Sequence, residues 1–285
     1  MASHVNPTVR RRRLGQELRR LREAKGLTAE WVAERLLVSQ SKISRLENGR
    51  RSINQRDVRD LCEVYGVEDE RVVESLMQMA KESRQQGWWN AFGDIPYSVY
   101  IGLETAAASV RNYESLLVPG LLQTQEYAEA VVEGMEPEAS TEDKARRVGV
   151  RIKRQDRIND LASPLRFWAV VDESALRRVV GDRRVMREQL EQLIEVSRRP
   201  HVTVQVLPFT AGAHPGMVGT FSLLEFANEG DSSVVYLEGV TSDLYLEKHH
   251  EVQRYSMMYE HLRALADPPE QSRRLMMNLA KDYAR

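Results

Sequence analysis

The segment LTAEWVAERLLVSQSKISRLENGR, residues 27–50, contains the signals of two short helices joined by a tight turn. Thr28 can cap the first helix. The turn is Leu37-Val38, and Ser39 can cap a second helix that covers Gln40 to Asn48. Two helices at this spacing predict a helix-turn-helix, whose second helix can enter the major groove of DNA.

The second helix of this pair divides into an apolar face and a polar face. Ile43 and Leu46 point inward. The opposite face carries four residues that we predict to contact DNA bases: Gln40, Ser41, Ser44 and Arg45. Glutamine and arginine pair bidentately with adenine and guanine, and serine can serve either base. Five residues at the borders of this face are predicted to contact phosphates: Thr28, Lys42, Asn48, Arg50 and Arg51.

Three more helices are predicted around this pair. A leucine stripe at i, i+4 and i+7 predicts a helix over residues 10–24, and similar apolar spacing predicts helices over 54–65 and 69–85. We therefore expect residues 1–84 to form an all-α five-helix DNA-binding domain. A helical bundle that binds protein instead of DNA is the alternative.

The charge of the chain is distributed unevenly. The net charge of the 285 residues is -1, but residues 1–60 hold 15 Lys and Arg against 7 Asp and Glu. A basic N-terminal segment joined to an acidic remainder of the chain indicates that the segment binds a polyanion such as DNA. A solvated charged face is the other interpretation of the same pattern.

Composition limits the remaining possibilities. A chain of 285 residues with 42% hydrophobic and 29% charged residues is typical of two globular domains. No apolar run approaches the ~20 residues that cross a bilayer, and no apolar stretch follows the basic N-terminus, so we expect a cytoplasmic protein without a secretory signal. The single cysteine, Cys62, excludes a disulfide framework and a multi-cysteine zinc site. No cofactor or metal is expected.

The stretch SQSKISRLENGR, residues 39–50, resembles the helix-turn-helix core of the lambda-repressor-like (XRE) family, and the similarity covers about residues 10–78. The resemblance implies base contacts by three of the residues already singled out: Gln40, Ser41 and Arg45. It also implies a structural ion pair between Arg22 and Glu47.

Two positions depart from the pattern of that family. Ala29 stands where a glutamine that contacts phosphate is common. Leu37 stands in the turn where glycine is usual, so Leu37 must tolerate the geometry of the turn or shift it. The second departure affects the pose of the helix that follows.

A different kind of domain is expected over residues 88–285, beyond the polar stretch KESRQQG at 81–87. Helical patterns occur over residues 98–113, 144–161 and 183–198 and in the last forty residues. Strand patterns occur over residues 165–171, 201–207, 220–226 and 233–237, with a turn at 228–231 between the last two. Helices gathered around these strands predict an α+β domain with a small, mainly antiparallel sheet.

Four segments of this second domain are distinctive in combination: YESLLVPGLLQTQEYA (113–128), RIKRQDRI (151–158), FWAVVDESALRR (167–178) and VQVLPFTAGAHPGMVGTFSLLEF (204–226). In these segments the chain resembles the uncharacterised C-terminal domain attached to XRE-type regulators of actinobacteria, including WhiJ-like developmental regulators. The similarity covers about residues 88–275. It implies a module that senses a ligand or binds a partner, often a small acidic protein, and it supplies no catalytic residues.

Two residues of the second domain are candidates for a ligand or partner site. His214 lies in the loop Pro208–Gly216 between two predicted strands and can change charge near neutral pH. A glycine-rich connector with a satisfied histidine is the alternative. Arg154 shares a helix face with Arg151 and Arg157 and could bind an anion, although the same spacing also fits a salt-bridged surface.

These features favour a sequence-specific DNA-binding transcriptional regulator. The chain contains no Gly-rich phosphate loop, G-x-S-x-G elbow or H-E-x-x-H motif, and we expect no enzyme. Because one recognition helix reads only a few base pairs, a homodimer on a near-palindromic site is expected. An antitoxin-like autoregulator that neutralises a small neighbouring protein and an enzyme with a DNA tether are the alternatives.

Overall fold

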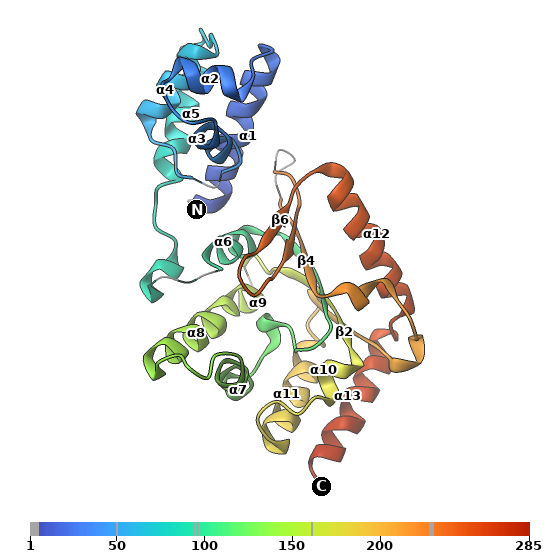
Figure 1. Ribbon diagram of the computed structural model, residues 1–285. Helices are drawn as coiled ribbons and strands as arrows, with labels where there is room; N and C mark the ends of the chain where they lie inside the picture. Colours follow the sequence, from blue (N-terminus) through green and yellow to red (C-terminus); the bar gives the residue numbers. More distant parts are fainter. Residues whose placement is uncertain (1–5, 50, 94, 96, 161, 228–230) are drawn as a thin grey trace. The chain divides into compact units, whose positions relative to one another are not determined.

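The computed structural model describes residues 6–49, 51–93, 95, 97–160, 162–227 and 231–285 (Figure 1). This part of the chain divides into two compact units. The first unit holds the described residues up to Ala91 together with Ser98–Ala106, and the second holds Phe92–Tyr97 and Ala107–Arg285. Within the described ranges, no helix is long and apolar enough to cross a membrane.

The five helices predicted for the first unit are confirmed: α1 (Pro7–Ala24), α2 (Ala29–Arg35), α3 (Gln40–Glu47), α4 (Gln55–Val64) and α5 (Glu70–Glu82). Each begins after a polar side chain that accepts a hydrogen bond from the backbone of the first turn: Asn6, Thr28, Ser39, Asn54 and Asp69. Their apolar faces meet in one core around Leu18, Ile43 and Leu61. A turn of 3-10 helix, η1 (Trp88–Phe92), follows α5, and α6 (Ser98–Ala106) packs on α1 within the same unit.

The second unit is built on a six-stranded mixed sheet of order β3-β2-β1-β4-β5-β6. Its strands are β1 (Ser109–Glu114), β2 (Arg166–Asp172), β3 (Val202–Leu207), β4 (Phe221–Glu225), β5 (Val234–Leu237) and β6 (Leu244–Leu246). β1, β2 and β3 pair in parallel, and the three other pairings are antiparallel. The predicted α+β class with a mainly antiparallel sheet is therefore confirmed.

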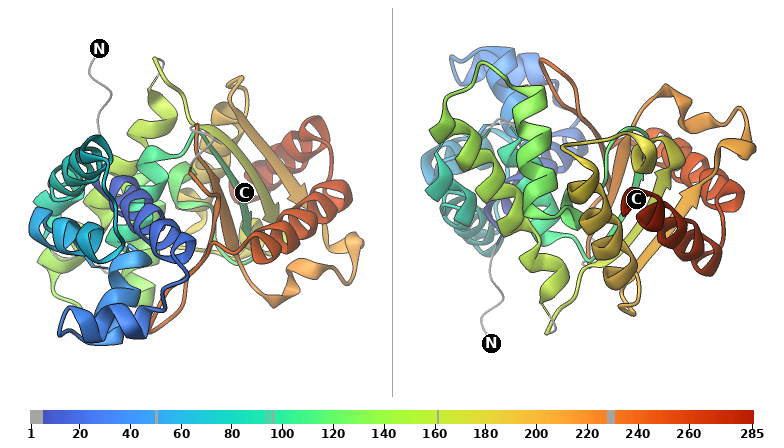
Figure 2. Two further views of the ribbon diagram at one scale, coloured as in Figure 1. Left: turned by 90° about the horizontal axis from the view of Figure 1, so that it is seen from above. Right: turned by 90° about the horizontal axis from the view of Figure 1, so that it is seen from below.

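Helices cover both faces of this sheet. α7 (Gln125–Met135), α8 (Thr141–Arg154) and α9 (Asp156–Asn159) connect β1 to β2, and α10 (Glu173–Arg177) and α11 (Arg183–Val196) connect β2 to β3. Parallel neighbours require such crossovers. α12 (His249–Leu265) packs on one face of the sheet, and α7 and α8 lie on the other side (Figure 1). α13 (Pro269–Tyr283) packs along α11 (Figure 2).

The predicted helix over residues 98–113 is wrong in its second half, because α6 ends at Ala106 and β1 follows. Ser109 pairs with Arg166 on one side and with Glu225 on the other. These partners are distant in the sequence, so local apolar spacing did not reveal a strand. Strand β6 was also not predicted. Of the predicted turn at 228–231, residues 228–230 lie outside the described part of the chain.

Candidate nucleic-acid interface

α3 presents the polar face that the sequence predicts to contact bases. The Ser39 hydroxyl accepts a hydrogen bond from the Lys42 backbone nitrogen at 3.2 Å and so caps the helix. Ile43 and Leu46 are buried on the inner face. The four predicted base-contacting residues are all exposed: Gln40, Ser41, Ser44 and Arg45. α3 therefore has the division of faces that a recognition helix requires.

Arg45 lies along α3 and is bonded to the preceding turn. Its Nε donates to the Ser41 carbonyl oxygen at 3.1 Å, and its Nη2 donates to the Ser41 hydroxyl at 3.4 Å. Asn48, at the end of the helix, donates in the same way to the Ser44 hydroxyl at 3.3 Å. Water competes with exposed hydrogen bonds of this kind, so releasing them costs little. Arg45 can therefore extend to a base edge.

The residues predicted to contact phosphates have different surroundings. The Thr28 hydroxyl accepts a backbone hydrogen bond at 3.1 Å and caps α2. The Lys42 ammonium lies 3.2 Å from Oδ1 of Asp57, an ion pair that the sequence pattern did not reveal. Arg51 is exposed, and Arg50 lies outside the described residues. Asp57 therefore competes with a phosphate for the Lys42 ammonium.

A buried ion pair between α1 and α3 holds α3 in position. Arg22 of α1 donates from Nε and Nη2 to the two carboxylate oxygens of Glu47, at 2.7 and 2.9 Å. The two side chains are only 9% and 4% exposed. Arg22 also donates from Nη1 to the carbonyl oxygen of Leu27 at 2.6 Å, just before α2. The pair that the family resemblance implies thus joins α1 to both helices of the helix-turn-helix.

Tyr65 belongs to the same network, a role that its sequence pattern does not indicate. Its hydroxyl donates to Oε1 of Glu47 at 3.2 Å. Burial and the Glu47 carboxylate hold the pKa of Tyr65 well above its ordinary value, so the hydroxyl stays a donor. Tyr65 continues the apolar stripe of α4, and this position indicated only a core residue. Its role depends on a carboxylate from α3, which no local pattern predicts.

The turn between α2 and α3 contains a strained residue. Leu37 has a φ of +53°, a left-handed conformation that costs a residue with a Cβ about 1–2 kcal/mol. Its side chain is 93% exposed, so little packing offsets this cost. Leucine therefore tolerates the turn at the expense of stability.

We expect Leu37→Gly to raise the free energy of unfolding of the first unit by about 0.5–1 kcal/mol, because glycine adopts positive φ without strain. Urea unfolding of the full chain, with hydrogen exchange of the α2 and α3 amides, measures this change. Leu116→Gly, at a leucine that is 55% exposed and has no positive φ, serves as the control and should give no gain. A destabilised Leu37→Gly variant would mean that the Leu37 side chain contributes contacts of its own.

In the second unit, His214 lies against the ends of β1 and β2. Its Nε2 is 3.6 Å from Oδ2 of Asp172, and its ring meets that of Tyr113 edge-on with centroids 6.1 Å apart. The Nδ1 atom of His214 is buried and has no hydrogen-bond partner. Asp172 also caps α10, since its Oδ1 accepts a hydrogen bond from the Ser174 backbone at 2.9 Å.

Arg154 lies on the opposite side of the sheet from His214. Its guanidinium stands 5.9 Å from the centroid of the Tyr97 ring. His214 contacts Tyr113, whereas the charge of Arg154 acts on Glu114. Tyr113 and Glu114 are consecutive in β1, so their side chains point to opposite faces. The two residues predicted for a ligand or partner site therefore do not form one site.

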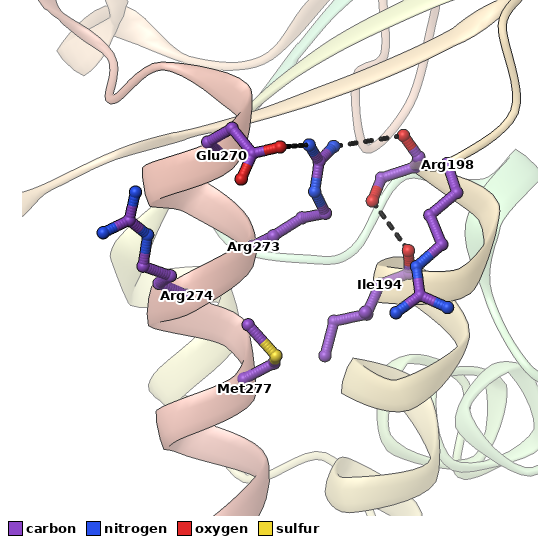
Figure 3. A pocket seen from close by; sticks show the side chains of 7 residues that line it. Ile194, Arg198, Glu270, Arg273, Arg274 and Met277 are labelled. Carbon is purple, nitrogen blue, oxygen red and sulfur yellow. Dashed lines mark hydrogen bonds and ion pairs between the residues drawn. The ribbon is translucent and has the colours of Figure 1, made fainter.

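Two hollows open on the surface of the second unit. A pocket of about 470 Å³ lies between α11 and α13, where Figure 3 shows Arg273 reaching across to the end of α11. Arg273 donates there to the Ser197 carbonyl oxygen at 3.4 Å and to Glu270 at 2.6 Å. A groove of about 810 Å³ lies between α7 and α8 and has apolar residues such as Val148 and Ile152 among its lining. The described side chains include no group of three or more His, Cys, Asp or Glu that could hold a metal ion.

Two family models match the chain. Residues 13–76 match the model of a helix-turn-helix domain, and residues 97–278 match that of a domain of unknown function, DUF5753. Comparison with curated proteins and with solved structures gave no match. The expected combination of a helix-turn-helix domain with an uncharacterised C-terminal domain is therefore confirmed. The helix-turn-helix match supports a DNA-binding regulator.

Proposed function

The chain belongs to the DUF5753 family, and from its helix-turn-helix domain we propose that it is a sequence-specific transcriptional regulator that binds double-stranded DNA. The observation that carries this proposal is the exposed polar face of α3, set on a buried apolar face and held by the Arg22–Glu47 pair. In this proposal α3 enters the major groove, where Gln40 and Arg45 contact base edges.

The regulator binds as a homodimer in our proposal. One helix contacts only a few base pairs, so useful specificity requires two copies on half-sites about one helical turn apart. The second domain acts by binding, not by catalysis, and its occupant is a small molecule or a small acidic protein. The pocket between α11 and α13 is lined by three arginines and one glutamate, and this excess of positive charge would suit an acidic partner.

Arg45→Ala tests the DNA-binding proposal. Arginine matches O6 and N7 of guanine with two parallel donors, so its loss should cost about 1–3 kcal/mol on the operator and relax the preference at one position in each half-site. The operator is first selected from random duplexes with the full chain. Affinities of the variant are then measured on the operator and on duplexes changed at each base pair.

Arg51→Ala is the matched control, because it removes the same charge from the border of the interface. It should weaken all duplexes about equally and reduce the slope of log affinity against log salt by about one. If Arg45→Ala gives this uniform loss as well, Arg45 is not a base contact. If no duplex is selected at all, the proposed function is wrong.

A further inference from the structure

The N-terminal part of α1 lies against the end of α3. A Cβ atom at Gly49, the residue that follows the C-cap of α3, would lie 2.8 Å from the Arg12 Cα atom, so the two backbones are in close contact there. Arg11 bridges the same contact, because its Nε donates to the Gly49 carbonyl oxygen at 2.7 Å. This hydrogen bond holds the Arg11 guanidinium beside the chain segment that leaves α3.

That segment includes residues that we predict to contact phosphates. Asn48 is the C-cap of α3, and the Arg51 backbone nitrogen donates to the Arg45 carbonyl oxygen at 3.2 Å, so the chain turns back toward α3. The side chains of Asn48 and Arg51 are exposed, whereas Gly49 between them is buried. Arg11 is therefore bonded to the backbone of the border at which the proposed function places DNA phosphates.

Arg11 differs from other arginines of α1 in how its charge is balanced. Four of them pair with a glutamate: Arg10, Arg19, Arg20 and Arg22. In the part of the chain that the structure describes, the Arg11 guanidinium has no carboxylate partner, and its hydrogen bond goes to a neutral carbonyl. The side chain is half-buried, and burial lowers the pKa of Arg11 because the charge is partly removed from water. A bound anion would compensate this charge.

The Arg11 guanidinium keeps donors for such an anion. Arginine has five N–H donors, and the Gly49 carbonyl takes only the one on Nε. Neither Nη atom of Arg11 is among the described atoms that are buried without a hydrogen bond, so both remain open to a ligand. Two N–H groups of a guanidinium match two phosphate oxygens. Because the carbonyl contact already orients the side chain, binding would cost little further side-chain entropy.

From this geometry we infer that Arg11 is a further phosphate contact of the DNA-binding unit, and that it links the pose of α3 to the DNA backbone by holding Gly49 and a phosphate together. The inference rests on the proposed function and adds to that interface a residue from outside the α2–α3 pair. Unlike Lys42, for which Asp57 competes, Arg11 gives up no ion pair when it binds a phosphate.

Arg11→Gln tests the inference in the full chain, with fluorescence anisotropy on the selected operator and on an unrelated duplex. One phosphate contact contributes about 0.9 to the slope of log affinity against log salt. The variant should lose this amount of slope, so its disadvantage should narrow about 3.5-fold between about 50 and about 200 mM salt. The loss of slope should be the same on both duplexes, because a phosphate contact carries no sequence information.

Arg13→Gln is the matched control, because it removes the same charge from the same helix. Two residues along an α-helix turn a side chain by about 200°, so Arg13 points away from the face that carries Arg11. Arg13 is exposed, and its variant should keep the slope of the parent chain. Arg11→Met retains an unbranched stem without the charge, and it replaces Arg11→Gln in the test if that variant fails to fold.

Arg11→Lys separates the charge from the anchored fork. An ammonium also neutralises a phosphate, so the slope should stay, but lysine lacks the planar fork, so the affinity for both duplexes should fall about twofold or more. A merely structural role of Arg11 would give the same change in both variants, because each displaces the end of α3.

The inference is overturned if removal of the Arg11 charge leaves the slope of the parent chain unchanged. It is also overturned if Arg11→Lys loses as much slope as Arg11→Gln, since the loss then comes from a displaced α3. Either result, with a parent chain that binds its operator, leaves the Arg45 test of the proposed function intact. A parent chain that selects no duplex overturns the proposed function and this inference together.

Discussion

Glu47→Ala is expected to lower the free energy of unfolding of the first unit by about 3–5 kcal/mol, because it leaves the buried Arg22 guanidinium without its carboxylate. The Tyr65 hydroxyl loses its acceptor in the same step. Urea unfolding of the full chain measures this loss. Hydrogen exchange of the α3 and α4 amides distinguishes the unfolding of the first unit from that of the second. DNA affinity should fall with stability, since the same pair holds α3.

A double-mutant cycle provides the control for this result. Arg22→Met combined with Glu47→Leu removes both charges, so the double variant should lose less stability than the sum of the two single variants. A loss below about 1 kcal/mol for Glu47→Ala would mean that water reaches Arg22 and that the pair does not anchor α3.

Gly15→Ala is expected to destabilise the first unit by about 3 kcal/mol, because α1 and α3 meet there backbone to backbone. A Cβ atom at Gly15 would lie 2.5 Å from the Glu47 carbonyl oxygen and 2.7 Å from that of Leu46. Neither carbonyl can move without shifting the end of α3. The same unfolding measurement quantifies the loss.

Gly134→Ala is the matched control, since Gly134 also lies in a helix but a Cβ there meets nothing within 4 Å. It should stabilise the second unit by about 0.5–1 kcal/mol through helix propensity. Equal effects at both glycines would show that the α1–α3 contact adapts to a methyl group.

The first unit could be predicted well from the sequence because its signals are local. Thr28 and Ser39 cap helices within three residues, and the apolar spacing of Ile43 and Leu46 sets the buried face of α3. The close approach at Gly15 could not be predicted, because nothing in a helical pattern indicates which backbone lies opposite.

The second unit was predicted less completely, for a different reason. β1 lacks a strong strand pattern of its own and is a strand because two distant segments bond to it. His214 was a candidate because of its place in a long loop and Arg154 because of its helix face, but the alternation of side chains along β1 places them on opposite faces of the sheet.

The central position of β1 has a consequence for synthesis on the ribosome. The helices of the first unit complete their contacts within the first 106 residues, so this unit can fold while the rest of the chain is still being made. β1 follows at once, but its partner β4 begins only at Phe221. Until then one edge of the nascent sheet stays open, and the long loop closure makes the second unit the slower one to fold. The nascent protein can therefore carry a finished helix-turn-helix unit before the second unit exists.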